Sequence, residues 1–245
     1  MRNTFFCIAV LISLVAVMVA CSKNDSSQPG PTHMRWINVT PGMAFDVYSD
    51  EEQIASDIAF DSVTSYAYGL PSFYYLQILK TGTSDTIVSG RQQMQSGLYY
   101  SMFVIPDTTS DGEISDTDAS VAIVTENTDL PSIDTFKYRF FNFAPFTSPI
   151  SVVMTIDGRT GTSDTLRPFS RRIFNDQASY STYSKYSQTI AANWKIHFYN
   201  STDTTLIDSF HYLFSSRGVY TIYLKAIEGV TTKNKFKDTI IQRGY

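Results

Sequence analysis

The sequence has few of the residues that most often carry chemistry, with two cysteines and three histidines among 245 residues. Cys7 lies inside an apolar N-terminal segment and Cys21 lies at its end. If that segment is removed as a signal peptide, Cys21 is the only cysteine left, so no internal disulfide can form. The histidines, His33, His197 and His211, have no nearby Cys, Asp and Glu set with metal-ligand spacing. A histidine-based metal site is therefore not expected.

Other absences narrow the function. No second long apolar run follows the N-terminal one, so we expect the rest of the chain to be soluble apart from any lipid. The net charge of -4 argues against nucleic acid as a partner, because phosphate binding needs a concentrated basic surface. The sequence also lacks a Gly-x-Ser-x-Gly elbow, a phosphate-binding loop and a dinucleotide fingerprint. These absences favour a protein that is not an enzyme and needs no cofactor.

The first twenty residues have the features of a bacterial lipoprotein signal peptide. The apolar stretch from Phe5 to Val19 is too short to span a bilayer comfortably as a helix. It ends in Met18-Val19-Ala20-Cys21, which resembles the lipobox, although Met18 stands where Leu is usual. The alternative is ordinary secretion with Cys21 incidental. We predict a signal peptide over residues 1–20 and lipidation of Cys21, since two acyl chains give stable anchoring.

Residues 21–33 predict a flexible tether, because a polar segment rich in turn formers cannot bury enough apolar surface to fold. Ser22 would be the second residue of the lipidated chain, in place of an aspartate of the kind that retains some lipoproteins at the inner membrane. This favours a lipid-anchored protein of the outer membrane. The segment resembles the heads of Bacteroidetes lipoproteins, and Lys23 and Asp25 weakly resemble surface-export signals of that phylum. The periplasmic and surface-facing sides both stay open.

Beyond the tether, alternating patterns typical of β-strands dominate. Aromatic residues are abundant, with 16 Tyr and 17 Phe, which favours strands over helices. Stretches such as 98–105 and 218–224 read as strands, and clusters of Gly, Asp, Ser, Thr and Asn between such stretches fit hairpin turns. Only residues 50–58 predict a helix, and a short one. Closely spaced short strands with such turns indicate β-sandwiches.

The chain beyond the tether contains an internal repeat. Three pairs of segments match in the same order: Arg35–Pro41 with Arg139–Pro145, Leu76–Ile78 with Ile196–Phe198, and Ser96–Tyr100 with Arg217–Thr221. In the third pair, Gly97 and Gly218 are matched as the glycines that release the chain from a turn into a strand. A spacing of about a hundred residues indicates two domains and not a solenoid.

We therefore predict an all-β fold with two tandem antiparallel β-sandwich domains of immunoglobulin- or transthyretin-like type. The first would cover residues 34–128 and the second residues 137–245, joined near Asn127 to Asp134. The repeat also predicts a similar strand order in the two domains.

The first half resembles the bacterial "domain of unknown function 4397" family. Repeats of that family open with Arg-hydrophobic-hydrophobic-Asn-x-x-Pro and continue through an Asp-Val-Tyr-like strand and a Gly-x-Tyr hairpin. The matching segments are Arg35 to Pro41, Asp46 to Tyr48 and Gly97 to Met102. The resemblance covers most of residues 34–128 and is weaker in the second half, where Ser151 to Val153 replaces the Asp-Val-Tyr element. It implies tandem β-sandwich modules in exported or surface proteins, and it supplies no catalytic residues.

One acidic loop offers oxygen ligands of the kind that calcium prefers. The candidate ligands are Asp107, Asp111, Glu113, Asp116 and Asp118. The alternate-residue spacing of an EF-hand loop is absent, and the corresponding stretch of the second copy, near residues 228–237, is basic. We therefore favour a solvated acidic loop and expect no metal.

Tyr180, Tyr183 and Tyr186 recur every three residues and are followed by Trp194. Exposed together, these rings could stack on sugars, because aromatic faces offer a large apolar area at a low entropy cost. Packing in a core or on a sheet face is the alternative.

Six triplets consist of Asp, then a hydroxyl residue, then a small aliphatic residue or Thr. They resemble the O-glycosylation sequon of exported Bacteroidetes proteins, and the acceptor hydroxyls would be those of Ser62, Thr86, Thr108, Thr165, Thr204 and Thr239. A turn that ends in Asp-Thr before a β-branched strand gives the same triplet. Glycan acceptors must be accessible, whereas simple junctions should bond locally to the backbone, with some hydroxyls buried.

Together these features predict a non-enzymatic, lipid-anchored cell-envelope protein that presents two β-sandwich modules for adhesion, assembly or ligand binding. One alternative is an accessory carbohydrate-binding lipoprotein with its tyrosines on a flat exposed face. Another is a fimbrial subunit-like protein with a removable or donated edge strand near residues 34–41 or at the C-terminus. The expected partners are a membrane, through the lipid, and either a glycan or another envelope protein.

Overall fold

The computed structural model describes residues 29–108, 113–126, 129–145, 147–159, 161, 164–179, 181–227 and 236–242. Residues 31–245 form one compact unit, and its described part is built from strands and short 3-10 helices, with no α-helix. The predicted all-β class is therefore confirmed. The predicted signal peptide, Cys21 and most of the predicted tether lie outside the described residues. In the part of the chain that is described, no helix is long and apolar enough to cross a bilayer.

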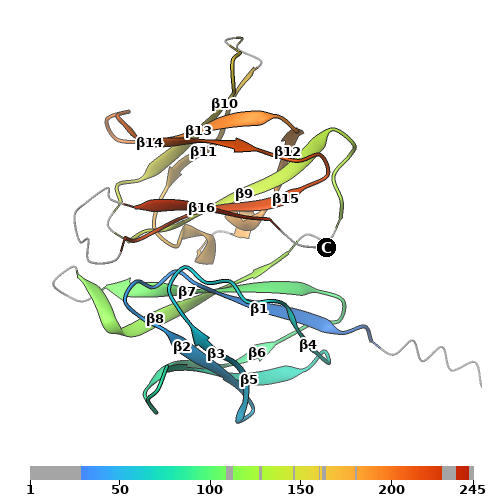
Figure 1. The fold of residues 1–245 in the computed structure, drawn as a ribbon, viewed down its shortest axis with the longest axis vertical. Coiled ribbons are helices and arrows are strands. Elements are labelled where there is room, and N and C mark those ends of the chain that lie inside the picture. The colour runs from blue at the N-terminus through green and yellow to red at the C-terminus, as the bar shows by residue number, and fades with distance from the viewer. Residues whose placement is uncertain are drawn as a thin grey trace, which may run out of the picture. The chain divides into compact units, whose positions relative to one another are not determined.

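The first half of the unit consists of two four-stranded sheets (Figure 1). One sheet has the order β4-β1-β7-β8 and the other has the order β3-β2-β5-β6. The strands are β1 (Thr32–Asn38), β2 (Phe45–Ser49), β3 (Glu52–Ile58), β4 (Ala67–Gly69), β5 (Phe73–Lys80), β6 (Thr86–Gln93), β7 (Tyr99–Thr108) and β8 (Ile114–Thr125).

The second half repeats this arrangement, with the sheet orders β12-β9-β15-β16 and β11-β10-β13-β14. Its elements are β9 (Thr135–Phe143), β10 (Ile150–Ile156), β11 (Thr165–Arg172), η2 (Asp176–Ala178), η3 (Ser181–Ser184), β12 (Ser187–Ile190), β13 (Asn193–Asn200), β14 (Leu206–Leu213), β15 (Val219–Lys225) and β16 (Lys237–Gln242). Each strand from β1 to β8 thus has a counterpart eight strands later. The similar strand order that the internal repeat predicts is confirmed.

The sheets depart from a purely antiparallel arrangement at one place in each half. β1 pairs in parallel with β7, and β9 pairs in parallel with β15, whereas the other strand pairs are antiparallel. After β1 the chain forms the strands of the facing sheet and adds β4 beside β1, and it then returns as β7 in the same direction as β1. Parallel neighbours need such a long connection, because a tight hairpin can join only antiparallel strands.

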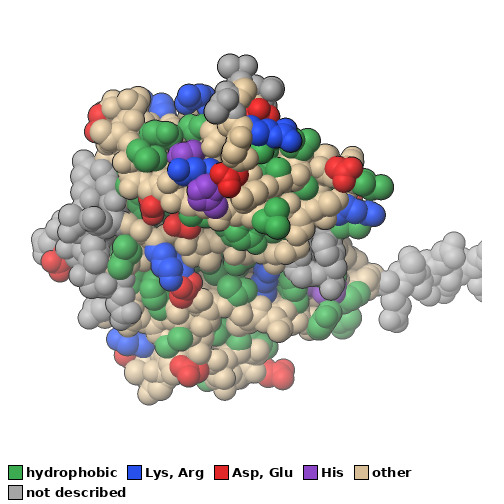
Figure 2. Space-filling view, turned by 45° about the horizontal axis from the view of Figure 1, so that its top comes forward, with side chains coloured by type: hydrophobic (Ala, Val, Ile, Leu, Met, Phe, Trp, Pro, Cys, Tyr) green, Lys and Arg blue, Asp and Glu red, His purple; other side chains and the backbone are tan. Residues whose placement is uncertain are grey.

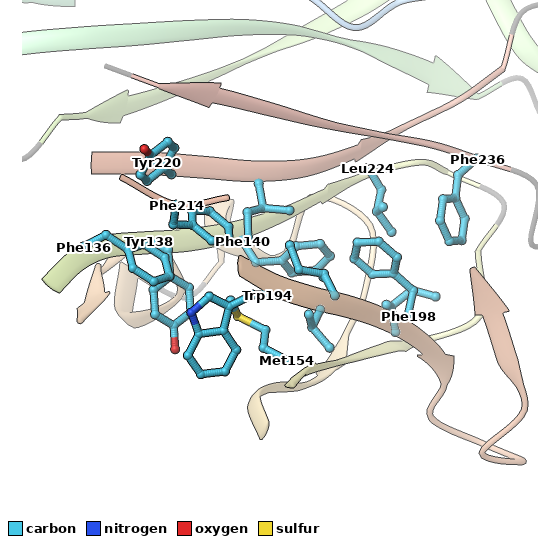
Figure 3. Packing of buried hydrophobic residues seen from close by; sticks show 14 of the residues in the cluster. Phe136, Tyr138, Phe140, Met154, Trp194, Phe198, Phe214, Tyr220, Leu224 and Phe236 are labelled. Carbon is cyan, nitrogen blue, oxygen red and sulfur yellow. The ribbon is translucent and has the colours of Figure 1, made fainter. Parts of the chain in front are cut away.

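Three hydrophobic clusters hold the unit together. One lies inside the first sandwich around Trp36, and one lies inside the second sandwich around Trp194 (Figure 3). The third cluster joins the halves and contains side chains of both, Ile37, Val39, Phe103, Ile105, Ala122, Val124, Phe141, Phe143 and Tyr223. Strands such as β1 and β15 are therefore buried along their whole length.

Two segments differ from the sequence-based expectation, one in its secondary structure and one in where the folded part begins. Residues 50–58 were expected to form a short helix, but Glu52–Ile58 is strand β3, which pairs with β2. Asp50 and Glu51 adopt positive φ angles of 47° and 73°, so the chain reverses in a tight turn. Thr32 and His33, which were expected in the tether, are buried and belong to β1. Pairing with β7 provides the hydrogen bonds and burial that the polar segment could not provide by itself.

The structure also corrects the match between Gly97 and Gly218. Pairing sets Tyr100 opposite Met34 in β1 and Tyr220 opposite Tyr138 in β9, so Arg217 takes the place of Gly97. Both residues have positive φ angles, 72° and 63°. Gly218 is instead required for space, because an added Cβ would lie 2.3 Å from the ring of Tyr220.

Candidate functional site

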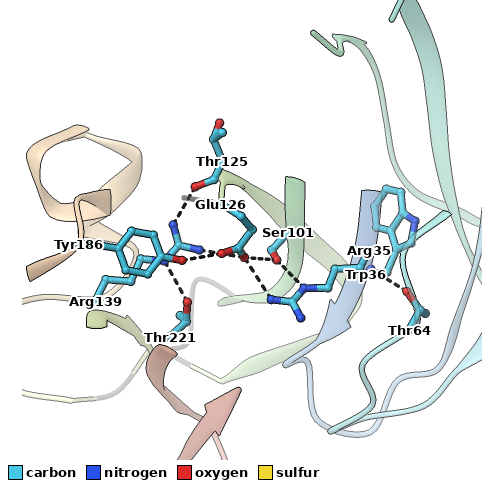
Figure 4. A network of polar contacts seen from close by, with 9 residues as sticks. All are labelled: Arg35, Trp36, Thr64, Ser101, Thr125, Glu126, Arg139, Tyr186 and Thr221. Atoms are coloured by element: carbon cyan, nitrogen blue, oxygen red, sulfur yellow. Dashed lines mark hydrogen bonds and ion pairs between the residues drawn. The ribbon is translucent and has the colours of Figure 1, made fainter. Parts of the chain in front are cut away.

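A buried carboxylate lies where the two halves meet. Glu126 follows β8, and its side chain is 1% exposed. Its Oε1 lies 3.1 Å from Nη2 of Arg35 in β1 and 3.0 Å from Nη2 of Arg139 in β9 (Figure 4). One acid of the first half thus forms ion pairs with a cation from each half.

The internal repeat places the two arginines. Side chains alternate along a strand, so Arg35 and Arg139 point away from the cores that their neighbours fill. Nε of Arg35 donates to Oγ of Ser101 at 2.7 Å, and Nε of Arg139 donates to Oγ1 of Thr221 at 2.9 Å. The hydroxyl residues occupy equivalent positions of β7 and β15. The first residue of the repeated Arg-x-x-Asn segment therefore serves the junction between the halves.

Further contacts complete the network. The hydroxyl of Ser101 donates to Oε1 of Glu126, and the hydroxyl of Tyr186 donates to Oε2. Nη1 of Arg139 donates to the carbonyl of Thr125 at 2.9 Å, and its guanidinium lies 4.4 Å from the ring centre of Tyr186. Both carboxylate oxygens are thus bonded, as a buried charge requires.

The surroundings fix the protonation of the network. Burial by itself raises the pKa of Glu126, but the guanidinium groups of Arg139 and Arg35 outweigh burial and lower this pKa to about 2. Burial raises the pKa of the Tyr186 phenol, so Tyr186 keeps the proton that it donates. The ionised carboxylate is enclosed by these partners, with 1% of its side chain exposed. The arrangement is suited to holding the two halves together.

We expect Glu126 to make stability fall in acid. Its pKa is about 2 in the folded protein and ordinarily 4.5, so its contribution is fully present above about pH 5 and is lost as the pH falls toward 2. A shift of this size corresponds to about 3 kcal/mol of unfolding free energy. Urea unfolding across this range should show a steeper loss in the wild type than in Glu126→Gln. Equal pH slopes in the two proteins would contradict the assignment.

A second ion pair joins the halves at another point. The side chain of Lys225 in β15 is 0% exposed and contacts Asp61, which lies in the loop after β3. Nζ of Lys237 also lies 3.3 Å from Oδ2 of Asp61. Sequence reasoning singled out neither this pair nor Glu126.

The asparagine of the repeated segment has a local role. Oδ1 of Asn38 accepts a hydrogen bond from the backbone N–H of Thr40 at 2.8 Å, and its Nδ2 donates to two backbone carbonyls. Oδ1 of Asn142 likewise accepts from the N–H of Ala144, at 3.1 Å. Each Asn therefore satisfies buried backbone groups where the strand ends.

Two of the four rings considered for sugar stacking are used inside the protein. Trp194 is 1% exposed and donates its indole N–H to a backbone carbonyl of the second half. Tyr186 is turned toward Glu126, and Tyr183 lies over the guanidinium of Arg172 at 4.3 Å. The fourth ring, Tyr180, lies outside the described residues. The packing alternative holds for these two rings, because Trp194 lies in the core and Tyr186 contacts the buried carboxylate of Glu126.

The candidate calcium ligands do not converge in the described part of the loop. Asp107 and Asp118 each accept a hydrogen bond from a serine hydroxyl, at 2.7 and 3.0 Å. Glu113 is exposed, whereas Asp111 and the side chain of Asp116 lie outside the part of the chain that the structure describes. Among the described residues, no group of three or more His, Cys, Asp or Glu side chains is placed to hold a metal ion.

The six hydroxyls of the Asp-Ser/Thr triplets differ in accessibility. Thr86, Thr108 and Thr204 are exposed, and Ser62, Thr165 and Thr239 are half-buried. The Thr239 hydroxyl is bonded to the phenol of Tyr223. The exposed group has the accessibility that glycan acceptors need, and the half-buried group suits turn-to-strand junctions. Acidic and basic side chains are interspersed on the face of the molecule that Figure 2 shows.

Comparison with known proteins supports the predicted family. Residues 32–153 match the family described as "Domain of unknown function (DUF4397)". The match covers the whole first half and continues through β9 into β10, so it includes both copies of the Arg-x-x-Asn segment. No curated protein matches the sequence.

Three solved structures are weakly similar. A family CBM26 module of Eubacterium rectale Amy13K in complex with maltoheptaose is 9% identical with a TM-score of 0.23, over 88% of this chain and 98% of that chain. A DUF3823 family protein from Bacteroides ovatus is 9% identical with a TM-score of 0.20, over 78% and 98%. BcpA, the major pilin subunit of Bacillus cereus, is 13% identical with a TM-score of 0.19, over 80% and 71%.

Proposed function

We propose that this chain is a non-enzymatic, lipid-anchored protein of the outer membrane that presents two joined β-sandwich modules for adhesion, assembly or ligand binding. The observation that carries the proposal is the buried junction between the modules, with its shared apolar cluster and the Arg35–Glu126–Arg139 ion pairs. A junction of this kind makes one stiff body from two modules. A stiff body on a tether of about a dozen residues suits the presentation of a surface away from a membrane.

We also propose that the second half is a further copy of the matched domain. The shared strand order, the equivalent arginines and the equivalent asparagines support this reading. Of the alternatives, a sugar-stacking face loses support because Trp194 and Tyr186 are occupied inside the protein.

Anchoring through Cys21 gives the first test of this function. In the native host, Cys21→Ser should abolish incorporation of labelled palmitate and should release or mislocalise the protein. The acyl chains are attached through the Cys21 side chain, so a serine in its place removes the group that anchors the protein. Cys7→Ser, within the predicted signal peptide, is the matched control and should leave the labelling intact. Normal labelling of Cys21→Ser would refute the anchor.

Glycosylation of the exposed triplets is a separate prediction. We expect at least two of the six sites to be modified in protein from its native host, and Thr86, Thr108 and Thr204 are the accessible candidates. Peptide mass spectrometry measures this directly, with protein made in a host without the transferase as the control. Peptides that all have the mass of the bare sequence would rule the modification out.

A further inference from the structure

A cleft opens into the first sandwich beside strand β6. Its volume is about 110 Å³, which is near the size of cavities that hold one six-membered ring. The walls are mostly apolar side chains of the first half, Trp36, Leu76, Ile78, Val88, Val121 and Ile123. Gly90 lines the cleft on β6, with Arg91 and Gln92 beside it.

The internal repeat explains why this space is empty. Gly90 of β6 pairs with Leu76 of β5. In the second half, Phe210 of β14 pairs with Ile196 of β13. Leu76 and Ile196 are equivalent, because Ile78 pairs with β2 as Phe198 pairs with β10. Gly90 therefore stands where the second sandwich has Phe210.

The ring of Phe210 packs against the second core, 6.0 Å from the ring centre of Phe198. At Gly90 an added Cβ would meet no atom within 4 Å. The first sandwich thus lacks an aromatic plug that its counterpart has, and the surrounding side chains do not fill the space.

Trp36, which lines the same cleft, carries an unpaired donor. Trp36 is 2% exposed, and its buried indole Nε1 has no hydrogen-bond partner among the described residues. The contrast is Trp194, whose Nε1 donates to the carbonyl of Ile190 at 3.1 Å. Buried polar groups are nearly always paired, so an unpaired one calls for a partner. Figure 4 shows the indole of Trp36 turned away from the side of β1 that Arg35 occupies.

We propose that this cleft binds a small neutral compound, or a group of one, with a ring-sized apolar body and an adjacent hydrogen-bond acceptor. The apolar body occupies the space that Gly90 leaves, and the acceptor receives the indole N–H of Trp36 after a small adjustment of the ring. The site goes beyond the proposed function, because it does not depend on where or how the protein is anchored.

The test uses the purified chain and two probes of similar shape, acetophenone, which carries a carbonyl acceptor, and ethylbenzene, which has none. We expect both probes to bind and acetophenone to bind about fivefold or more tightly, as one extra hydrogen bond provides. Gly90→Phe should weaken both probes more than tenfold, because the new ring fills the cleft as Phe210 does. Gln93→Phe, which adds the same ring at an exposed position of β6, is the matched control and should bind both probes normally.

A second variant tests the hydrogen bond to the acceptor separately from the filling of the cleft. Trp36→Phe, which introduces the residue found at the equivalent position 140, should still bind ethylbenzene and should lose the preference for acetophenone. This variant decides the acceptor claim even if Gly90→Phe fails to fold. Absence of binding to the wild type, unchanged binding by Gly90→Phe, or an unchanged preference in Trp36→Phe would overturn the proposal.

Discussion

Glu126→Gln is expected to lower the free energy of unfolding by about 3 to 5 kcal/mol, the usual cost when one partner of a buried ion pair is removed. The substitution keeps the shape of the side chain and removes its charge. Arg35 and Arg139 would then be two buried cations with no anion between them. Urea unfolding at neutral pH measures the loss.

The matched control for this variant is Asp164→Asn. Asp164 lies 3.6 Å from Arg159, whose side chain is 62% exposed, so water screens this pair and its loss should cost less than about 1 kcal/mol. If Glu126→Gln were as mild as Asp164→Asn, the network would not hold the halves together.

Phe103→Ala should lower the free energy of unfolding by a similar amount, about 3 to 5 kcal/mol, because it leaves a cavity in the shared cluster. Phe103 of β7 is 0% exposed, and its ring centre lies 4.8 Å from that of Phe143 and 5.4 Å from that of Tyr223, both in the second half. The loss should appear in the unfolding of both halves. Near-ultraviolet circular dichroism during denaturation reports the aromatic packing that this variant disturbs.

Phe73→Ala removes the same ring from an exposed position of the first half, where Phe73 is 53% exposed. We expect this control to change stability by less than about 1 kcal/mol. A Phe103→Ala protein no less stable than the Phe73→Ala protein would contradict the shared cluster.

Much of the fold follows from local patterns. The alternating stretches predict the strands, and the repeated Arg-x-x-Asn segments predict the equivalence of β1 and β9. The helix expected at residues 50–58 was wrong because the turn depends on positive φ angles at Asp50 and Glu51, which residue types alone do not reveal. The predicted tether, residues 21–33, extends too far, because Thr32 and His33 are buried by pairing with strands far along the chain.

The network around Glu126 depends on long-range packing, which explains why the sequence did not single it out. Glu126 and Arg35 are 91 residues apart, and no spacing rule links them. A signal was nevertheless present, because two arginines recur at equivalent positions of strands with almost no other charge. Buried cations need an anion, so a search for an acid near both strands would have reached Glu126. The sequence left the role of Trp194 open, since a core tryptophan and a sugar-stacking tryptophan are the same residue type.

The central claim is that the two sandwiches fold and unfold as one unit through their buried junction. Differential scanning calorimetry of the soluble chain tests it most directly. We expect a single transition whose calorimetric enthalpy equals the van't Hoff enthalpy, as for one cooperative body. Two separate transitions, with each half melting independently of the other, would contradict it.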